Sequence, residues 1–297
     1  MFEQLGLIGC GLMGGSFALA LKKAGLVKRV VGYSKSPSTT ARALEMGVID
    51  MQAVSAEAAA TGSDLVLLAL PVGATQAALA SIQHVVTPQM LIMDVGSTKG
   101  DVVQAARQAL GAQIASFVPA HPNTGKEVAG VAHADADLYH GAKVILTPTE
   151  HTLPSHLDKA QAVWKALDCD VRVMSPETHD AAFAAVSHLP HLLAFAMMQS
   201  VMQQSQADAF LSIAGPGFRD FTRIAAGDPK MWRDILLANK DEVLAQARQF
   251  KDAVQAFEQV LQNHDGQGLE DMITAASTAR AQCRFNQPAA ATAASSV

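Results

Sequence analysis

The sequence predicts an α/β fold: an N-terminal domain with a mostly parallel sheet, followed by an all-α C-terminal dimerisation domain. Up to about residue 174, short apolar runs alternate with helical patterns, which is typical of a parallel sheet covered on both faces. The first apolar run leads into a glycine-rich turn. Beyond residue 175 no convincing strand pattern follows, and the helical segments there are apolar on more than one face.

Local signals predict the elements in order. Strands are expected where apolar residues run together, at residues 4–9, 29–33, 64–70, 90–94, 114–118, 143–146 and 170–173. Proline at a helix start and glycine after its end help to predict helices over residues 14–24, 37–47 and 157–167. Further helices are expected at residues 177–206, 231–263 and 267–284, with a loop-rich connection at 215–229. We therefore expect domains over residues 1–174 and 175–285, and a disordered, low-complexity tail over 286–297.

The composition limits the class of protein. Of 297 residues, 49% are apolar and 16% are charged, which excludes an intrinsically disordered chain. The net charge is −5 without a basic run, so neither nucleic acid nor an acidic membrane surface is an expected partner. The longest apolar run, residues 65–72, is far shorter than the ~20 residues of a membrane helix. Three widely spaced cysteines without a CxxC motif suit a reducing compartment, and we expect a cytoplasmic protein.

A dinucleotide-binding motif occupies residues 9–14, Gly9-Cys10-Gly11-Leu12-Met13-Gly14. It follows a predicted strand and opens a predicted helix, which is the context of G-x-G-x-x-G in a Rossmann-type domain. Gly9 permits the tight turn, Gly11 lets the backbone approach the pyrophosphate, and Gly14 allows close packing of helix and strand. The phosphates would then lie at the helix N-terminus. The expected cofactor site also includes Leu12, Met13, and Leu70 and Pro71 at the end of the strand 64–70.

The end of the second predicted strand bears on the choice of cofactor. An acidic residue that binds the ribose of NAD is expected about 20 residues after the motif. The chain has Ser34, Lys35 and Ser36 there. The missing carboxylate, the lysine and the hydroxyls favour the 2′-phosphate of NADP, against the alternative that Lys35 is a surface lysine beside an NAD site. We therefore expect NADP as the preferred cofactor and NAD as the alternative.

Two polar segments that follow predicted strands are candidates for the chemistry. Ser97 and Lys99 follow the strand 90–94, and ligands of a doubly wound sheet bind at the carboxyl ends of its strands. Ser97 would also serve as a helix N-cap. His121 follows the strand 114–118 and precedes a proline. It is a candidate general base, against the alternative of a structural histidine.

Two further segments lie in the predicted helical domain. His188 and His191 share a helix face and are expected to line a polar substrate pocket. No HExxH motif or third ligand at a fixed spacing supports a metal site, so none is expected. The remaining histidines, His156 among them, look like surface residues. Residues 217–223 carry two arginines, Arg219 and Arg223, of the type that binds carboxylates through two hydrogen bonds.

Taken together, these segments resemble the prephenate/arogenate dehydrogenase family of tyrosine biosynthesis. The resemblance covers nearly the whole chain through Gly9-x-Gly11-x-x-Gly14, Asp94-Val-Gly-Ser97-Thr-Lys99-Gly100, His121-Pro122-x-x-Gly125-x-Glu127, Ser187-His188-Leu-Pro-His191, Gly217-Phe-Arg-Asp220-Phe-Thr-Arg223-Ile-Ala and Asp228-Pro-x-Met-Trp232. Any one piece is weak, whereas six in this order are a specific signal. The resemblance implies an NAD(P)-dependent oxidoreductase with a Rossmann domain and a helical domain that forms a homodimer.

The family's reaction is oxidative decarboxylation of prephenate or arogenate to 4-hydroxyphenylpyruvate or tyrosine, with hydride transfer to NAD(P). By resemblance, His121 would accept a hydrogen bond from the C4 hydroxyl, and Ser97 would orient His121 or the nicotinamide. Arg223 would bind a substrate carboxylate. The remaining implied site residues are Asp220, which would orient that loop, Glu127 at the gate of the pocket, and His188 and His191 in its lining. Inhibition by tyrosine is also implied.

One position departs from the family's pattern. Lys126 precedes Glu127, where many relatives carry a small or neutral residue. The lysine would favour a keto acid and the glutamate an ammonium group, so the choice between prephenate and arogenate stays open. Two other functions are considered: a β-hydroxyacid dehydrogenase of the 3-hydroxyisobutyrate type, and a regulator without enzyme activity that senses NADP. The first would need a catalytic lysine in the helix 177–206, which has none.

Overall fold

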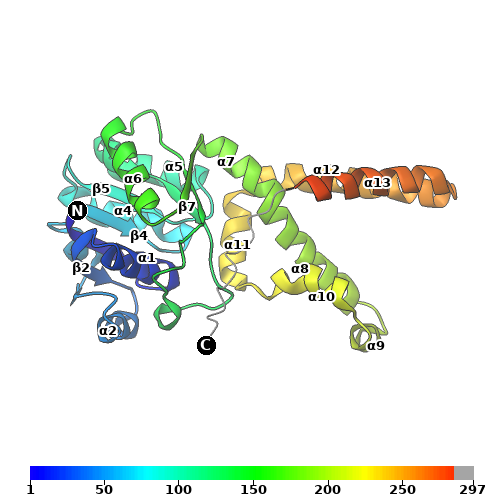
Figure 1. Cartoon of the computed structure of the whole chain (residues 1–297), viewed down its shortest axis with the longest axis horizontal. Helices are drawn as coiled ribbons and strands as arrows, with labels where there is room; N and C mark the ends of the chain where they lie inside the picture. Colours follow the sequence, from blue (N-terminus) through cyan, green and yellow to red (C-terminus); the bar gives the residue numbers. More distant parts are fainter. Residues whose placement is uncertain (284–297) are drawn as a thin grey trace, which may run out of the picture. The chain divides into compact units, whose positions relative to one another are not determined.

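The computed structural model describes residues 1–283 (Figure 1), so the tail expected at 286–297 lies outside the described residues. Six parallel strands form one sheet in the order β3-β2-β1-β4-β5-β6, which is the order of dinucleotide-binding Rossmann domains. The strands are β1 Phe2–Ile8, β2 Val27–Tyr33, β3 Met51–Gln52, β4 Leu65–Leu68, β5 Leu91–Asp94 and β6 Phe117–Val118. The predicted parallel sheet is confirmed.

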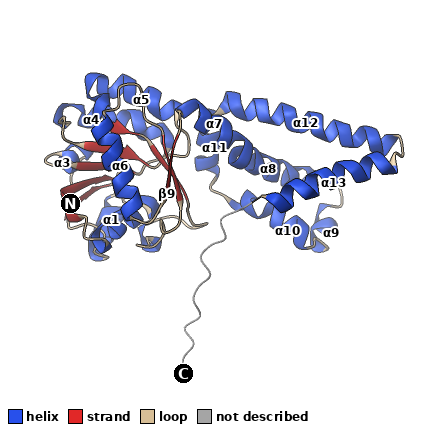
Figure 2. Ribbon diagram, turned by 45° about the horizontal axis from the view of Figure 1, so that its top comes forward, coloured by secondary structure: helices blue, strands red, loops and turns tan. Residues whose placement is uncertain are grey.

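Helices cover both faces of this sheet (Figure 2). Successive side chains of a strand point to opposite faces, so Leu65 and Leu67 of β4 belong to one apolar core, and Val66 and Leu68 to the other. The first core includes residues of α1 Leu12–Lys23 and α6 Pro154–Ala166. The second includes residues of α3 Ala56–Ala60, α4 Thr75–Ile82 and α5 Gly100–Leu110, while α2 Pro37–Glu45 packs beside β3.

The last strands form a second sheet, whereas the sequence suggested a single series. β7 (Ala120–Asn123) pairs antiparallel with β8 (Lys143–Leu146), which pairs parallel with β9 (Asp170–Val173). The strand predicted over 114–118 is reduced to β6, because residues Gly111–Ser116 form a 3-10 helix. Pro119 lies between β6 and β7 and has no amide hydrogen for a strand ladder. The chain therefore changes sheets at this proline.

The helical part of the chain contains a π-turn. The predicted helix 177–206 is divided into α7 (Pro176–Phe183), a π-helical turn (Ala184–His188) and α8 (Leu189–Met202). Pro190 lacks the amide hydrogen that would bond four residues back, which accounts for the changed turn. The connection expected at 215–229 also holds α10 (Pro216–Thr222) and a 3-10 turn. The other helices here are α9 Ala207–Ser212 and α11 Pro229–Ala238.

The chain divides into two compact units, residues 1–242 and the chain from Val243 onward. α12 (Lys240–Gln262) begins just before this division. In the second unit it is followed by α13 (Gly266–Gln282), whose first turn is capped by the Asp265 carboxylate, which accepts a hydrogen bond from the Gly268 amide at 2.9 Å. The boundary expected after residue 174 falls inside the first unit, between β9 and α7.

Within the described residues, one helix, Pro176–Met202, is long and apolar enough to cross a membrane by length and composition alone. Core helices of other proteins pass the same test, so this is a weak sign of a membrane span. The helix also carries three buried polar residues, His179, Asp180 and His188, and each of them has a hydrogen-bond partner in the chain.

Candidate active site

The glycine-rich turn between β1 and α1 has the shape that a dinucleotide needs. Gly9 has a φ of +102°, and a Cβ there would lie 2.1 Å from the Ala69 carbonyl oxygen. A Cβ on Gly14 would lie 2.1 Å from the Gly9 oxygen, whereas one on Gly11 would meet no atom within 4 Å. The first turn of α1 has no acidic residue and no side-chain cap. Its free amide groups and the open space at Gly11 therefore fit a pyrophosphate.

The end of β2 lies beside this turn, because the Cys10 amide donates a hydrogen bond to Ser34 Oγ at 2.8 Å. Lys35 and Ser36 are exposed, and Lys35 forms no ion pair with the rest of residues 1–283. Ser36 precedes α2, whose first turn also lacks an acidic residue. A serine, a free lysine and an uncapped helix N-terminus thus lie where the adenosine ribose of a Rossmann ligand binds.

The other expected cofactor residues surround the same turn. Leu70 approaches Gly9: its Cδ2 would lie 3.1 Å from a Cβ there. Pro71 is exposed at the start of the short helix Val72–Ala74. Leu12 is buried, and the Met13 carbonyl accepts a hydrogen bond from the Tyr139 hydroxyl at 2.7 Å. Leu12 and Met13 therefore anchor the start of α1, and Leu70 and Pro71 border the open side.

His121 lies within β7, not after a strand as expected, and is 7% exposed. A buried ion pair fixes the backbone before it. Lys99 Nζ lies 2.5 Å from Asp94 Oδ2 and donates a hydrogen bond to the Ala120 carbonyl at 2.9 Å. The Ala120 amide donates to Asp94 Oδ1 at 2.9 Å. Lys99, which we expected near a ligand, is fully buried and holds Ala120 in place.

His121 is linked to two residues of α7, His179 and Asp180, to which the sequence analysis assigned no role. His121 Nδ1 lies 2.8 Å from His179 Nε2, and His179 Nδ1 lies 2.8 Å from Asp180 Oδ1. The Asp180 carboxylate also accepts hydrogen bonds from the amides of Lys99, at 2.9 Å, and Gly100, at 2.8 Å. This series of hydrogen bonds links β7, α7 and the N-terminus of α5. The only signal in the sequence was the His-Asp dipeptide itself.

Burial keeps both imidazoles of this chain of contacts neutral. Burial, and after it the electrostatic effects of His179 and Lys99, which oppose a second positive charge nearby, hold the pKa of His121 well below 6.5. Burial also lowers the pKa of His179, against the opposing effect of Asp180. Burial alone would raise the pKa of Asp180, but hydrogen bonds from His179 and two backbone amides bring it below 3.8. At neutral pH the site therefore holds two neutral imidazoles and one carboxylate.

The π-turn directs His188 into the interior, where it is 1% exposed. The Asn239 amide nitrogen donates to the Asp180 carbonyl at 2.8 Å, and the same nitrogen lies 3.1 Å from His188 Nδ1. Because that nitrogen is a donor, His188 Nδ1 is an acceptor, and the neutral ring carries its proton on Nε2. Among the described residues His188 Nε2 has no partner. It is a buried donor that fits a ligand oxygen. Sequence reasoning missed Asn239.

His191 lies half-buried against an aromatic residue that follows in the chain. Its ring is stacked on Trp232 with centroids 3.6 Å apart, and its Nδ1 donates a hydrogen bond to the Ser187 carbonyl oxygen at 2.9 Å. His191 Nδ1 therefore carries a proton. Trp232 also contacts the edge of His188, with centroids 6.3 Å apart. His188 and His191, which were expected in one pocket, thus both contact the indole ring of Trp232.

The charged residues of the expected substrate site are exposed and paired. Arg223 forms an ion pair with Glu127, and the two side chains are 61% and 73% exposed. Asp220 lies 3.8 Å from Arg219 rather than beside Arg223, so the structure shows no contact through which it would orient Arg223. The structure therefore brings Arg223 and Glu127 together and leaves Asp220 apart from them.

Lys126 is engaged by its own loop. Its Nζ lies 2.9 Å from Asp135 Oδ2, and this ion pair neutralises the charge that we expected to sense the substrate. Ser97 is half-buried, and within residues 1–283 its hydroxyl makes no hydrogen bond, so it caps no helix. The hydroxyl is therefore available to a ligand.

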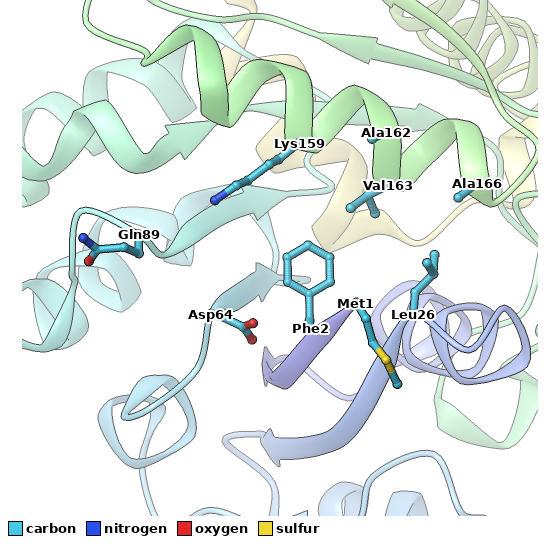
Figure 3. A pocket seen from close by; sticks show the side chains of 9 residues that line it. All are labelled: Met1, Phe2, Leu26, Asp64, Gln89, Lys159, Ala162, Val163 and Ala166. Atoms are coloured by element: carbon cyan, nitrogen blue, oxygen red, sulfur yellow. The ribbon is translucent and has the colours of Figure 1, made fainter.

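No group of three or more His, Cys, Asp or Glu side chains in residues 1–283 is arranged to hold a metal ion. A cavity of about 450 Å³ lies at the amino ends of the sheet strands, away from the glycine turn (Figure 3). It is lined mainly by apolar side chains, with Asp64, Gln89 and Lys159 at its polar edge. It contains none of the expected site residues.

Comparison with known proteins agrees with this arrangement. The sequence model of the family of prephenate dehydrogenase nucleotide-binding domains matches residues 17–174. The sequence model of the family of prephenate dehydrogenase dimerization domains matches residues 175–275. Prephenate dehydrogenase of Bacillus subtilis is 35% identical over 271 residues, which are 91% of this chain and 73% of that protein. Cyclohexadienyl dehydrogenase of Zymomonas mobilis is 30% identical over 282 residues, 94% of this chain and 96% of that protein.

A solved structure is similar over the same length. Prephenate dehydrogenase from Aquifex aeolicus, crystallised with hydroxyphenyl propionate and NAD+, has a TM-score of 0.89 and 34% identity to this chain. The match covers 95% of this chain and 98% of that one. Both parts of the first unit, the Rossmann sheet and the helices that follow it, therefore have a counterpart of known structure.

Proposed function

The chain belongs to the prephenate dehydrogenase family, and from that premise we propose that it oxidatively decarboxylates prephenate, arogenate or both in tyrosine biosynthesis. Family membership makes it an oxidoreductase. It does not favour the β-hydroxyacid dehydrogenase or the regulator without enzyme activity. The reaction removes a hydride from C4 of the cyclohexadienyl ring and CO2 from C1, and leaves a phenol. A bound nicotinamide supplies the hydride acceptor.

The observation that carries the proposal is the buried, neutral imidazole of His121. A general base must be unprotonated at the working pH, and burial keeps the pKa of His121 well below 6.5. As the hydride leaves C4, the hydroxyl oxygen there becomes positive and carbonyl-like, and a hydrogen bond to His121 disperses that charge. The O–H is present again in the phenol, so no proton is consumed or released overall. Ser97, whose hydroxyl makes no hydrogen bond with the described residues, is the proposed partner for His121 or the nicotinamide.

Donors for the substrate carboxylates come from the helical part of the chain. We assign one carboxylate to Arg223, which would exchange its exposed ion pair with Glu127 for the ligand. His188, whose buried Nε2–H has no partner in the described part of the chain, is a second donor at the site. His191, stacked on Trp232, would line the ring-binding side. For Arg223→Ala we expect kcat/KM to fall by roughly 10²-fold with cofactor binding unchanged.

A turnover assay with prephenate and with arogenate, each with NAD and with NADP, tests the activity directly. His121→Asn should keep the binding of substrate and cofactor and lower kcat by ~10²- to 10⁴-fold, which is the usual contribution of general acid–base catalysis. An inactive wild-type enzyme on both substrates would refute the function. An unchanged kcat in His121→Asn would remove this residue from the mechanism.

For the cofactor we propose a preference for NADP over NAD. It is supported by Ser34, by Lys35, which forms no ion pair within residues 1–283, and by the α2 N-terminus without acidic residues. No carboxylate repels the 2′-phosphate of NADP here, and one or two charge-assisted hydrogen bonds would bind it. Together these effects should favour NADP over NAD by ~2–4 kcal/mol, or roughly 30- to 10³-fold. Ser34→Asp should shift the preference toward NAD with little change in the chemical step. A wild-type kcat/KM higher with NAD than with NADP would contradict the proposal.

We also propose a homodimer formed through the helices, in the cytoplasm. Large apolar side chains stay exposed within the first unit, among them Val186 at 73% and Ile213 at 80%. Residues 175–275 match a dimerization domain. Light scattering at micromolar concentration should give twice the 31.1 kDa of one chain. Tyrosine, which is the product from arogenate, should compete with substrate, and an unchanged KM in its presence would exclude competition.

A further inference from the structure

We propose that His179, held by Asp180, fixes the tautomer of His121 so that Nε2 faces the substrate with a free lone pair. The inference rests on the proposed function, in which His121 accepts a hydrogen bond from the substrate hydroxyl. It assigns His179 as a positioning residue, because His179 acts on the reaction only through His121.

The first step is the carboxylate of Asp180. It is 8% exposed as a residue and accepts hydrogen bonds from the amides of Lys99 and Gly100. Both are obligate donors, so an ionised carboxylate satisfies them. An ionised carboxylate can only accept, and its remaining contact is His179 Nδ1 at 2.8 Å. His179 Nδ1 must therefore carry a proton.

The second step is the ring of His179. It is fully buried and stacked on Phe183, with centroids 4.4 Å apart. A neutral imidazole with its proton on Nδ1 has a lone pair on Nε2. That atom lies 2.8 Å from His121 Nδ1, so the proton between them belongs to His121. His121 then has its lone pair on Nε2, which makes no hydrogen bond with the rest of residues 1–283.

The opposite tautomer at His188 shows that the arrangement is specific to each ring. There Asn239 donates to Nδ1, so Nε2 carries the proton. Both assignments depend on Asp180, whose side chain holds His179 and whose carbonyl oxygen holds Asn239. One residue of α7 thus makes one histidine an acceptor and the other a donor toward a ligand.

The tautomer can be measured without substrate. Long-range ¹H–¹⁵N correlation spectra of the full-length protein labelled with ¹⁵N-histidine distinguish Nδ1–H from Nε2–H rings. The His121 signals are identified by their loss in His121→Asn. We expect a neutral ring with the proton on Nδ1 at pH 7. A proton on Nε2, or a cationic ring, would overturn the proposal even if the turnover assay succeeds.

Two substitutions at His179 test the effect on catalysis. His179→Phe keeps the aromatic volume but has no acceptor for His121, and kcat should fall between ~10- and ~10²-fold, less than the ~10⁴-fold that a wrong tautomer costs in serine proteases. His179→Gln offers an amide oxygen near the position of Nε2 and should retain more activity. In both variants KM for the cofactor should stay unchanged, and the correlation spectrum of His179→Phe should show a mixture of His121 tautomers.

The matched controls are the same two substitutions at His156. That histidine is also buried, at 2% exposure, but lies on α6 and has no hydrogen-bond partner among the described residues. His156→Phe and His156→Gln should leave kcat unchanged. If His179→Phe costs no more kcat than His156→Phe, or if His179→Gln is worse than His179→Phe, the positioning role is refuted. If His179→Phe does not fold, the spectrum of the wild-type protein still decides.

Discussion

Replacing Lys99 by methionine should cost more stability than any single surface substitution. Lys99 and Asp94 form an ion pair at 2.5 Å, and their side chains are 0% and 3% exposed. Methionine has a similar length but leaves the Asp94 carboxylate without its counter-charge. It also removes the donor to the Ala120 carbonyl, whose bond with Lys99 Nζ is 2.9 Å long. The carboxylate keeps only the amides of Gly96, at 2.8 Å, and Ala120, at 2.9 Å.

The magnitude follows from the burial of the pair. Removing one partner of a buried ion pair costs ~3–5 kcal/mol, because the other charge stays buried without compensation. That is a large part of the ~5–15 kcal/mol by which domains are stable. The matched control is Lys28→Met, because Lys28 pairs with Glu3 at 2.7 Å and the two side chains are 53% and 70% exposed. An exposed pair contributes only ~0–1 kcal/mol.

Urea unfolding, followed by circular dichroism and by tryptophan fluorescence, measures the difference between these variants. We expect Lys99→Met to lose at least ~3 kcal/mol relative to Lys28→Met. Asp94→Asn combined with Lys99→Met should recover part of the loss, since no uncompensated charge remains. Equal midpoints for Lys99→Met and Lys28→Met would show that the pair does not hold the structure together, and would refute the argument from burial.

Because burial holds the pKa of His121 well below 6.5, the acid limb of kcat/KM should have its midpoint below pH 6.5, and a midpoint above it would contradict the assignment. Burial lowers the pKa of His188 to about 4, so only the unfolded chain binds this proton between pH 6.5 and 4. Between pH 6.5 and pH 4 the free energy of unfolding of the wild type should therefore fall by ~3 kcal/mol more than that of His188→Asn. Urea unfolding midpoints of both proteins at these two pH values test this expectation. Gly14→Ala should abolish cofactor binding by calorimetry, because its Cβ would lie 2.1 Å from a carbonyl oxygen, whereas Gly266→Ala, which meets nothing within 4 Å, should not.

Most of the Rossmann sheet could be predicted because each signal for it lies within a few neighbouring residues of the sequence. β1, β2, β4 and β5 are short apolar runs, and the motif at Gly9, Gly11 and Gly14 depends on neighbours within one turn. β3, the exposed pair Met51–Gln52, is no apolar run and was not expected. Strand partners are different, because an apolar run does not show what it pairs with. Residues 143–146 and 170–173 were expected as strands and form them, but in a second sheet with β7.

The site was predicted less completely, because its contacts join distant parts of the chain. His121 and His179 are 58 residues apart, and Lys99 and Asp180 are 81 apart. A single sequence shows that each residue is polar but not which one it meets. His156 was expected at the surface but is buried. This expectation failed for the same reason, because the burial of a histidine on a helix depends on neighbours that a single sequence does not reveal.

The shared position of Asp180 decides which substitutions are informative. Its carboxylate caps two amides at the start of α5, and its carbonyl oxygen holds Asn239. An Asp180 variant would therefore change stability, the His179 contact and the α5 terminus at once, and a loss of activity would have no single cause. His179 has a narrower set of hydrogen bonds, because among the described residues its two ring nitrogens bond only to Asp180 and His121. A change in kcat at His179 that leaves cofactor binding and the unfolding midpoint intact can be attributed to His121.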